Sequence, residues 1–457
     1  MKIVVIGGAG VRTPLLMPAL ARRQERLDLR QVVLVDRDEA RLELMAPLIQ
    51  HAAQRHNATF DLSWTTEAAE ALTGADAVIT TIRVGGEEAR VLDERIARRH
   101  GVLAQETTGV GGFAMALRSI PVIAEYAQMM REMCPHAWLL NFTNPAGLVA
   151  QAMVTQFPDL KVAGICDTPM GLQSAVAHAF QRRPDQVSAR FFGLNHLSWL
   201  AEAVIDGENV VPRIVADPEL ASRIEELSLF EPGLLRLLGI LPNEYLYFYY
   251  YRERAVANIA SAEETRGEQV RRLSRELIQE LREIDPAANP TSAHHRYQRY
   301  LHSRHGSYLA METGGAIQHQ GDRENESDPQ AEGEGYAGVA LDILAPAGKL
   351  AEVVANVPNG GAIPGMRADD AVEVTCHRDA TGLHPVPFER VPEEELLLMQ
   401  TVKQYERLTV EAIRTHSRQS AIEALMTHPL IGSYSLAEGL LSDILKVHRQ
   451  YVGEWSA

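Results

Sequence analysis

The chain has 457 residues, a length that fits two or three domains or one large one. Its 44 Lys and Arg against 60 Asp and Glu give a formal charge of −16, the wrong sign for a protein whose main partner is duplex nucleic acid. The 46% of hydrophobic residues excludes a disordered chain, and the three cysteines do not form a disulfide framework. No apolar run reaches the ~18–20 residues of a membrane span. From this and from the acidic charge, we expect a cytoplasmic protein with neither a membrane nor a nucleic-acid partner.

Short apolar runs alternate with helical patterns through the first part of the chain. The runs are residues 2–6, 32–35, 77–82, 137–140 and 162–165. Strands that alternate with helices in this way are typical of a parallel, doubly wound sheet of the Rossmann type, an α/β fold. In such sheets ligands bind outside the carboxyl ends of the strands, and the chemically distinctive residues of this half follow those ends.

A glycine turn follows the first predicted strand and precedes a helical pattern. Its residues are Gly7, Gly8, Ala9 and Gly10. The backbone N–H groups of such a turn can approach a pyrophosphate, although the spacing is not G-x-G-x-x-G and a plain strand-to-helix turn stays open. Asp36 ends the second strand, where a carboxylate can accept ribose hydroxyls and repel a 2′-phosphate. We therefore predict an NAD-binding domain over residues 1–169.

The pattern changes from about residue 170 onward. Helical stretches dominate there, with strand-like segments near 188–204 and 350–357. The polar residues 318–335, rich in Gly, Asp and Glu, predict a mobile loop. Helical periodicity from Glu393 onward predicts a long helix pair. We expect residues 170–457 to form a second, substrate- and metal-binding α+β domain.

Several side chains could carry chemistry, but none is decisive alone. Cys166 follows a predicted strand, where a cysteine is often a small buried hydrophobe. Cys166 and His196 together fall short of the three or four ligands of a zinc site, so counting residues does not establish a metal. Tyr245 begins an aromatic run whose rings at helical spacing are mostly core. Bidentate anion binding is open to Arg83, Arg90, Arg118 and Arg266.

Taken together, motifs spread along the chain form one combination. They are GGAG at 7–10 with Thr13, RVGG at 83–86 with Arg90, QETTGVGG at 105–112, NFTNP at 141–145, CD at 166–167 and GLNH at 193–196. This combination resembles the NAD- and manganese-dependent family 4 glycoside hydrolases, most of all their 6-phospho-β-glucosidases. The resemblance implies a Rossmann domain followed by an α+β domain of the lactate/malate dehydrogenase type. It also implies NAD and Mn²⁺ as cofactors and assembly into a homodimer or homotetramer.

The resemblance further implies hydrolysis of a phosphorylated sugar glycoside by an unusual route. Most glycosidases use two carboxylates, whereas this family is an exception. NAD⁺ oxidises C3 of the sugar, a tyrosine removes the C2 proton, the aglycone leaves by elimination, water adds, and C3 is reduced again. The C3 ketone acidifies the C2 proton, and a divalent cation can stabilise the resulting enolate.

The same resemblance assigns roles to individual residues. Cys166 and His196 match the metal ligands, and Tyr245 matches the catalytic base. Asp167 matches a position where some phospho-α-glucosidases carry the leaving-group acid and many β-specific members have Asn. Substrate-binding roles fall on Arg90, Glu106, Asn144 and Arg266, and cofactor-binding roles on Gly7, Gly8, Ala9, Gly10, Thr13 and Asp36.

Other functions stay open from the sequence. A family 4 glycosidase could act on an α-linked glycoside, because of Asp167, or on an unphosphorylated one, because residues 304–311 differ from the commoner family pattern. An NAD-dependent 2-hydroxy-acid dehydrogenase would share the two-domain layout but would not need a metal-binding cysteine. A non-catalytic nucleotide-binding module would keep the glycine turn and Asp36 without needing Cys166, His196 and Tyr245 together.

Overall fold

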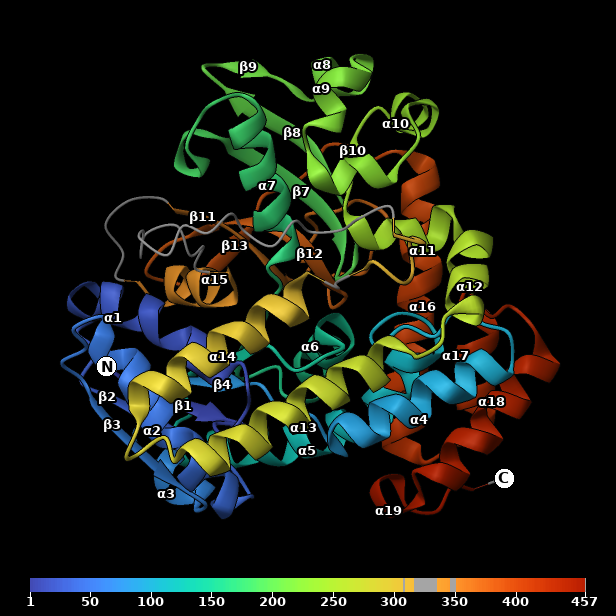
Figure 1. The fold of residues 1–457 in the computed structure, drawn as a ribbon. Helices are drawn as coiled ribbons and strands as arrows, with labels where there is room; N and C mark the ends of the chain where they lie inside the picture. The colour runs from blue at the N-terminus through green and yellow to red at the C-terminus, as the bar shows by residue number, and fades with distance from the viewer. Residues whose placement is uncertain (307–308, 316–334, 346–350, 457) are drawn as a thin grey trace.

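The computed structural model describes residues 1–306, 309–315, 335–345 and 351–456. Of the mobile loop expected near 318–335, only residue 335 is among the described residues, so the loop stays a prediction. Among the described residues, the strands form a nine-stranded sheet in the order β13-β12-β11-β6-β5-β4-β1-β2-β3 and a smaller four-stranded sheet (Figure 1). No helix in the described ranges is long and apolar enough to cross a membrane.

Six strands from the N-terminal part form the parallel portion of the large sheet. They are β1 (Lys2–Ile6), β2 (Gln31–Val35), β3 (Asp61–Thr65), β4 (Ala77–Thr80), β5 (Trp138–Asn141) and β6 (Lys161–Gly164). Their spatial order, β3-β2-β1-β4-β5-β6, is that of a doubly wound Rossmann sheet, which confirms the predicted α/β fold class. The sequence missed β3, because this edge strand has no buried residue and carries no apolar run.

The central strands are apolar because helices cover the sheet. Ile3, Val4 and Val5 of β1 have no exposed surface, as expected of strands buried on both faces. The helices that follow the parallel strands are α1 (Leu16–Leu27), α2 (Glu39–Arg55), α3 (Ala68–Leu72), α4 (Gly86–Arg99), α5 (Val110–Met133), α6 (Ala146–Gln156) and α7 (Thr168–Ala179). The chain crosses from β3 back to β4, beside β1, so the strand order reverses between β1 and β4 and leaves a binding crevice there.

Strands from the later part of the chain extend the same sheet. β11 (Ala351–Pro358), β12 (Ala371–Arg378) and β13 (Leu383–Pro385) continue it antiparallel beyond β6, where Asn356 lies opposite Gly164. The smaller sheet contains β7 (Ser188–Leu194), β8 (Leu197–Ile205), β9 (Glu208–Asn209) and β10 (Leu241–Pro242). The domain division at residue 169 stays a prediction, and the large sheet takes strands from both sides of it.

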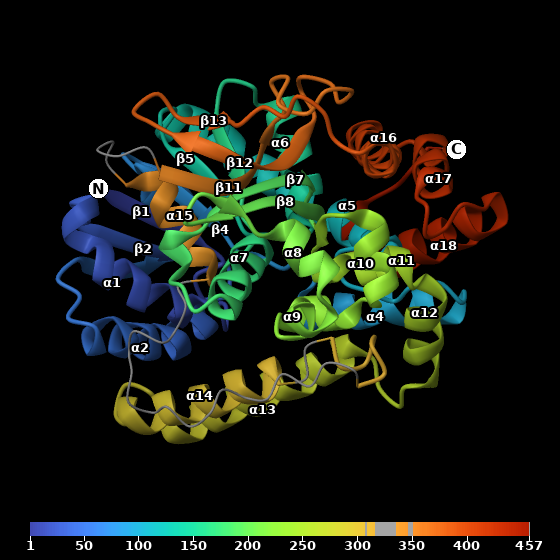
Figure 2. The same cartoon turned by 90° about the horizontal axis from the view of Figure 1, so that it is seen from above.

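Helices from the later half surround the sheets. α13 (Arg266–Ile284) and α14 (Pro290–His305) form a hairpin along one side of the molecule, with α13 against α4 and α14 against α2 (Figure 2). α16 (Glu393–Thr415) and α17 (Arg418–Thr427) pack together as the predicted pair, and α18 (Tyr434–Val447) adds a third helix. The remaining helices are α8 (Val211–Ala216), α9 (Pro218–Ser222), α10 (Pro232–Leu238), α11 (Tyr247–Tyr250), α12 (Arg252–Ser261), α15 (Gly335–Leu344) and α19 (Arg449–Val452).

A buried ion pair joins α4 to α5. Arg118 donates two hydrogen bonds to Asp93, at 3.0 and 2.6 Å, and its Nε donates to the carbonyl of Val84. His448, near the C-terminus, lies 2.6 Å from the same carboxylate. The side chains of Arg118 and Asp93 are 1% and 5% exposed, so each charge depends on the other.

We expect Asp93→Ala to lower the melting temperature sharply, because it leaves the Arg118 charge buried without its carboxylate, at a cost of about 3–5 kcal/mol. The double variant Asp93→Ala/Arg118→Met should recover part of the loss. The matched control is Asp159→Ala, which breaks the largely exposed pair with Arg131 and should change little. Thermal unfolding followed by circular dichroism measures all three, and equal losses in the single variants would contradict the buried-pair argument.

Candidate active site

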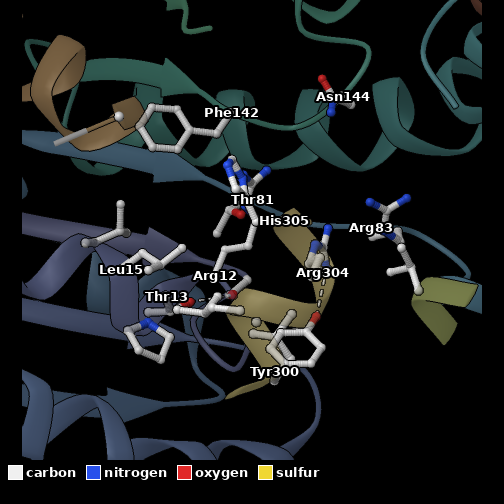
Figure 3. Close-up of a pocket in the computed structure, with 18 of the residues that line it drawn as sticks. Arg12, Thr13, Leu15, Thr81, Arg83, Phe142, Asn144, Tyr300, Arg304 and His305 are labelled. Atoms are coloured by element: carbon white, nitrogen blue, oxygen red, sulfur yellow. Dashed lines mark hydrogen bonds between the residues drawn. The ribbon is translucent and has the colours of Figure 1, made fainter. Parts of the chain in front are cut away.

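One large cavity, of about 2600 Å³, opens at the carboxyl ends of the parallel strands and is bounded on another side by α14. Figure 3 shows Thr13 and Leu15 toward one end and Arg83 and Asn144 toward the other. Most of the predicted site residues line it: Gly7, Ala9, Gly10, Thr13, Asp36, Arg90, Glu106, Asn144, Asp167, Tyr245 and Arg266. The structure therefore brings the three predicted groups, for cofactor, substrate and catalysis, to a single cavity.

The glycine turn after β1 needs glycine for steric reasons. Gly7 has a φ of +90°, and a Cβ there would lie 2.7 Å from the carbonyl oxygen of Thr81. A Cβ on Gly8, which does not line the cavity, would lie 2.6 Å from the Cβ of Leu34. The carboxylate of Asp36 accepts a hydrogen bond from the backbone N–H of Ala9 at 3.1 Å. The glycine turn and the Asp36 carboxylate are thus in direct contact, an arrangement that fits a dinucleotide whose ribose lies near Asp36.

An ion-pair cluster forms the charged end of the cavity. Glu106 bridges two guanidiniums, with 2.5 Å to Arg83 and 2.5 Å to Arg90, and Arg90 also contacts Glu94 at 2.7 Å. Burial by itself raises the pKa of the Glu106 carboxyl, but the positive charges of Arg83 and Arg90 outweigh burial and hold that pKa below its ordinary value. Glu106 is therefore ionised and fixes both arginines at the cavity wall.

Arg266 reaches the same end of the cavity from α13. The helix begins with a capping box, in which Thr265 and Glu268 bond to each other's backbone N–H groups. Arg266 Nη2 donates to the carbonyl of Arg304 at 2.7 Å, and Arg304 donates to the hydroxyl of Tyr300 at 2.8 Å (Figure 3). Several guanidiniums thus converge where a phosphate could bind, and Arg304 and Tyr300 extend the set that the sequence suggested.

Tyr245 and His196 form a stacked pair. Their ring centroids are 3.6 Å apart and their planes differ by 3°. His196 occupies the tight turn between β7 and β8, with a φ of +61°, and it is buried behind the cavity wall. Within residues 245–251, all of which the structure describes, only Tyr245 lines the cavity. Tertiary structure thus singles out one ring of the aromatic run.

A buried polar chain holds the backbone of Tyr245. Glu373 of β12 accepts a hydrogen bond from Ser198 at 2.8 Å, and Ser198 in turn accepts one from the Asn243 amide at 2.8 Å. The side-chain oxygen Oδ1 of Asn243 accepts a hydrogen bond from the backbone N–H of Tyr245 at 2.9 Å. Glu373 was not among the residues predicted from the sequence, although a carboxylate within an otherwise apolar strand is a usable signal of a buried polar role.

Cys166 and His196, the predicted metal ligands, are both buried, and neither is among the residues that line the cavity. Cys166 is 5% exposed, and burial, followed by the nearby charges of Glu373 and Asp167, raises the pKa of its thiol. Burial lowers the pKa of His196 to about 3, so its imidazole is neutral, as metal ligation requires. Among the described residues, no cluster of three or more His, Cys, Asp or Glu could hold a metal. A metal at these two side chains would take further ligands from substrate and water.

Glu106→Gln should lower the melting temperature near neutral pH, because it removes the charge that holds Arg83 and Arg90 together. The folded-state pKa of Glu106 lies below its unfolded value, so this stabilisation is fully present above the ordinary pKa of 4.5 and fades as the pH falls below it. The melting temperatures of parent and variant should therefore differ by a constant amount above pH 4.5 and converge as the pH falls below 4.5. A difference that stays constant into the acid range would contradict the assignment.

Comparison with known sequences finds one family over most of the chain. The profile of the family 4 glycosyl hydrolases matches residues 2–182, and that of the family's C-terminal domain matches residues 191–431. A relative from Bacillus subtilis, a probable 6-phospho-beta-glucosidase, is 31% identical over 465 residues, covering 100% of this chain and 98% of the relative.

Solved structures agree with this match. The 6-phospho-beta glucosidase of Thermotoga maritima, solved with manganese, NAD⁺ and glucose-6-phosphate, is 26% identical, with a TM-score of 0.81 and 100% of both chains covered. A malate dehydrogenase of Cryptosporidium parvum, 13% identical with a TM-score of 0.52 over 90% of this chain and 98% of its own, shares the fold alone. The expected dehydrogenase-like architecture is confirmed, and the chain belongs to the family 4 glycosyl hydrolases.

Proposed function

We propose that this chain hydrolyses 6-phospho-β-glucosides with NAD and a divalent cation, Mn²⁺ by preference. The observation that carries the proposal is the stacked pair of Tyr245 and His196, because it joins the expected base to an expected metal ligand beside the cavity that also contains the glycine turn. The names of the B. subtilis and T. maritima relatives support the substrate class.

The chain's own residues bind and orient the two reactants. The turn at residues 7–10, whose own N–H groups bond to Val35, Asp36 and Gly7, lets the backbone approach the pyrophosphate closely, and Asp36 accepts the ribose hydroxyls. At the other end of the cavity Arg90 and Arg266 bind the 6-phosphate, with Asn144 as a neutral partner on the sugar. The arginines favour a dianion such as the 6-phosphate. Because Glu106 already partly neutralises Arg90, the site does not carry several uncompensated positive charges when no substrate is bound.

The reacting carbons lie between these two ends. When bound, NAD⁺ supplies oxidation and later re-reduction of C3, and the divalent ion supplies Lewis-acid stabilisation of the enolate. Cys166 and His196 would hold that ion, and Tyr245 takes the C2 proton on its phenolic oxygen. Asp167, at the start of α7 and on the cavity wall, donates a proton to the departing glycosidic oxygen.

An α-linked substrate is the second candidate. The observation that favours it is Asp167 itself, which occupies the position associated with a leaving-group acid in phospho-α-glucosidases and lines the cavity. Assembly into a homodimer or homotetramer and a cytoplasmic location also stay predictions for this chain.

The function is tested with nitrophenyl glucosides in matched pairs: β and α, each with and without the 6-phosphate. We expect the enzyme, supplied with NAD⁺ and Mn²⁺, to release nitrophenol from the phosphorylated β-glucoside at a rate well above the other three. NADH absorbance should show no net change, because each turnover regenerates NAD⁺. Faster release from the α-glucoside would select the second candidate. Stoichiometric NADH formation from a 2-hydroxy acid would instead identify a dehydrogenase.

Tyr245→Phe should reduce hydrolysis by about 10²-fold or more, because it removes a general base and leaves the ring in place. It should slow exchange of the sugar's C2 hydrogen with solvent deuterium by a similar factor. Tyr247→Phe is the matched control, since Tyr247 is also buried in the aromatic run but does not line the cavity. Exchange at the parent rate in Tyr245→Phe would place the base elsewhere.

A further inference from the structure

Glu312 is a buried carboxylate in the cavity wall, and it has no role in the function proposed above. It is 4% exposed and lines the same cavity as Arg90 and Arg266. Its Oε2 atom is buried and has no hydrogen-bond partner among the described residues. Because buried polar atoms in folded proteins almost always have a partner, an unpartnered carboxylate oxygen in a cavity wall indicates a ligand that supplies a donor.

The backbone around Glu312 is held in place by hydrogen bonds. Its carbonyl oxygen accepts one from Nδ2 of Asn258, in α12, at 3.0 Å. The backbone N–H and the hydroxyl of Thr313 both donate to the carbonyl of Leu309, at 3.1 and 2.8 Å. These contacts fix the position of Glu312 without using its carboxylate.

The charges around Glu312 place it near the proposed phosphate-binding residues. Burial raises the pKa of its carboxyl above the ordinary value, and the negative charge of Glu94 adds to that effect. Its own backbone N–H and the positive charges of Arg266 and Arg90 act in the opposite direction. A carboxylate can only accept hydrogen bonds and it repels a phosphate dianion, so the 6-phosphate is not the donor that suits Oε2.

The donors that remain on a phosphorylated sugar are its hydroxyl groups. Carbons C1, C2 and C3 take part in the proposed reaction, so that side of the sugar lies toward Tyr245 and the cofactor. With the 6-phosphate at Arg90 and Arg266, the hydroxyl nearest to the phosphate is the one on C4, because C4 and C6 are both attached to C5. The C4 hydroxyl is therefore the donor that fits Glu312.

We propose that Glu312 is a specificity-determining residue whose Oε2 atom accepts a hydrogen bond from the C4 hydroxyl of the phosphorylated sugar. The inference deepens the proposed function and rests on it for the position of the 6-phosphate. A site that hydrogen-bonds a substrate hydroxyl rejects an analogue without that hydroxyl, because the buried acceptor is then left unpaired. Glu312 thus selects sugars whose C4 hydroxyl has the orientation found in glucose.

Binding of matched ligands to the parent enzyme tests this contact first. Calorimetric titrations, with NAD⁺ present and no divalent metal, compare glucose 6-phosphate with 4-deoxyglucose 6-phosphate. We expect the deoxy sugar to bind about 10- to 100-fold more weakly, as the loss of a hydrogen bond to a charged group predicts. Equal affinities would overturn the inference, whatever the variants do.

Substitution of Glu312 supplies the second readout. Glu312→Met removes the carboxylate but keeps a side chain of similar length, so it should bind both sugars equally and glucose 6-phosphate about 10- to 100-fold more weakly than the parent. Glu312→Gln keeps a carbonyl acceptor and should recover part of the affinity. The matched control is Thr313→Val, because Thr313 is also buried but does not line the cavity, and this variant should bind as the parent does. Parent-like affinity for glucose 6-phosphate in Glu312→Met would contradict the proposed contact.

Inorganic phosphate distinguishes a hydroxyl contact from a phosphate contact. Glu312→Met should bind it at least as tightly as the parent, because the variant removes a negative charge near Arg90 and Arg266. Weaker phosphate binding in this variant would mean that a protonated Glu312 donates to the phosphate, which would overturn the assignment to the C4 hydroxyl. Failure of the proposed function looks different, because the parent would then bind neither inorganic phosphate nor either sugar phosphate.

Discussion

The parallel register of the central strands is the constraint on which the site depends. Ile6 of β1 lies opposite Val35 of β2 and Thr80 of β4, so these three strands end at the same level. The segments that follow them begin at one edge of the sheet, where the glycine turn and Asp36 meet. This edge lies at the reversal of strand order, which is where open α/β sheets bind ligands.

Charge balance shapes the other end of the cavity. Arginines gathered for a phosphate repel one another when no anion is bound, and burial makes that repulsion costly. Here Glu106 contacts Arg83 and Arg90, while Glu94 contacts Arg90 and accepts a hydrogen bond from the backbone N–H of Gly267. The carboxylates thus maintain the arginine arrangement and at the same time connect α4 to the start of α13.

Buried polar contacts connect the small sheet to the large one at the catalytic residues. Glu373 of β12 accepts hydrogen bonds from Ser198 of β8, from Asn195 in the β7–β8 turn and from Asn356 of β11. The same turn carries His196, which stacks on Tyr245. The expected base and metal ligand are therefore held by contacts between segments far apart in the sequence, and a shift of either sheet would move both.

Local sequence patterns determined the parallel strands, the glycine turn and Asp36, because apolar runs and turn residues act over a few neighbouring positions. The motif combination also identified the family, and every predicted pocket residue in the charged end, including Arg90 and Glu106, lines the cavity. Only tertiary structure decided that the partly exposed segment DLSWT is an edge strand and that β11 to β13 extend the N-terminal sheet. It alone distinguished Tyr245 from its aromatic neighbours and placed Glu312 in the cavity wall, since both placements bring together residues that no local pattern relates.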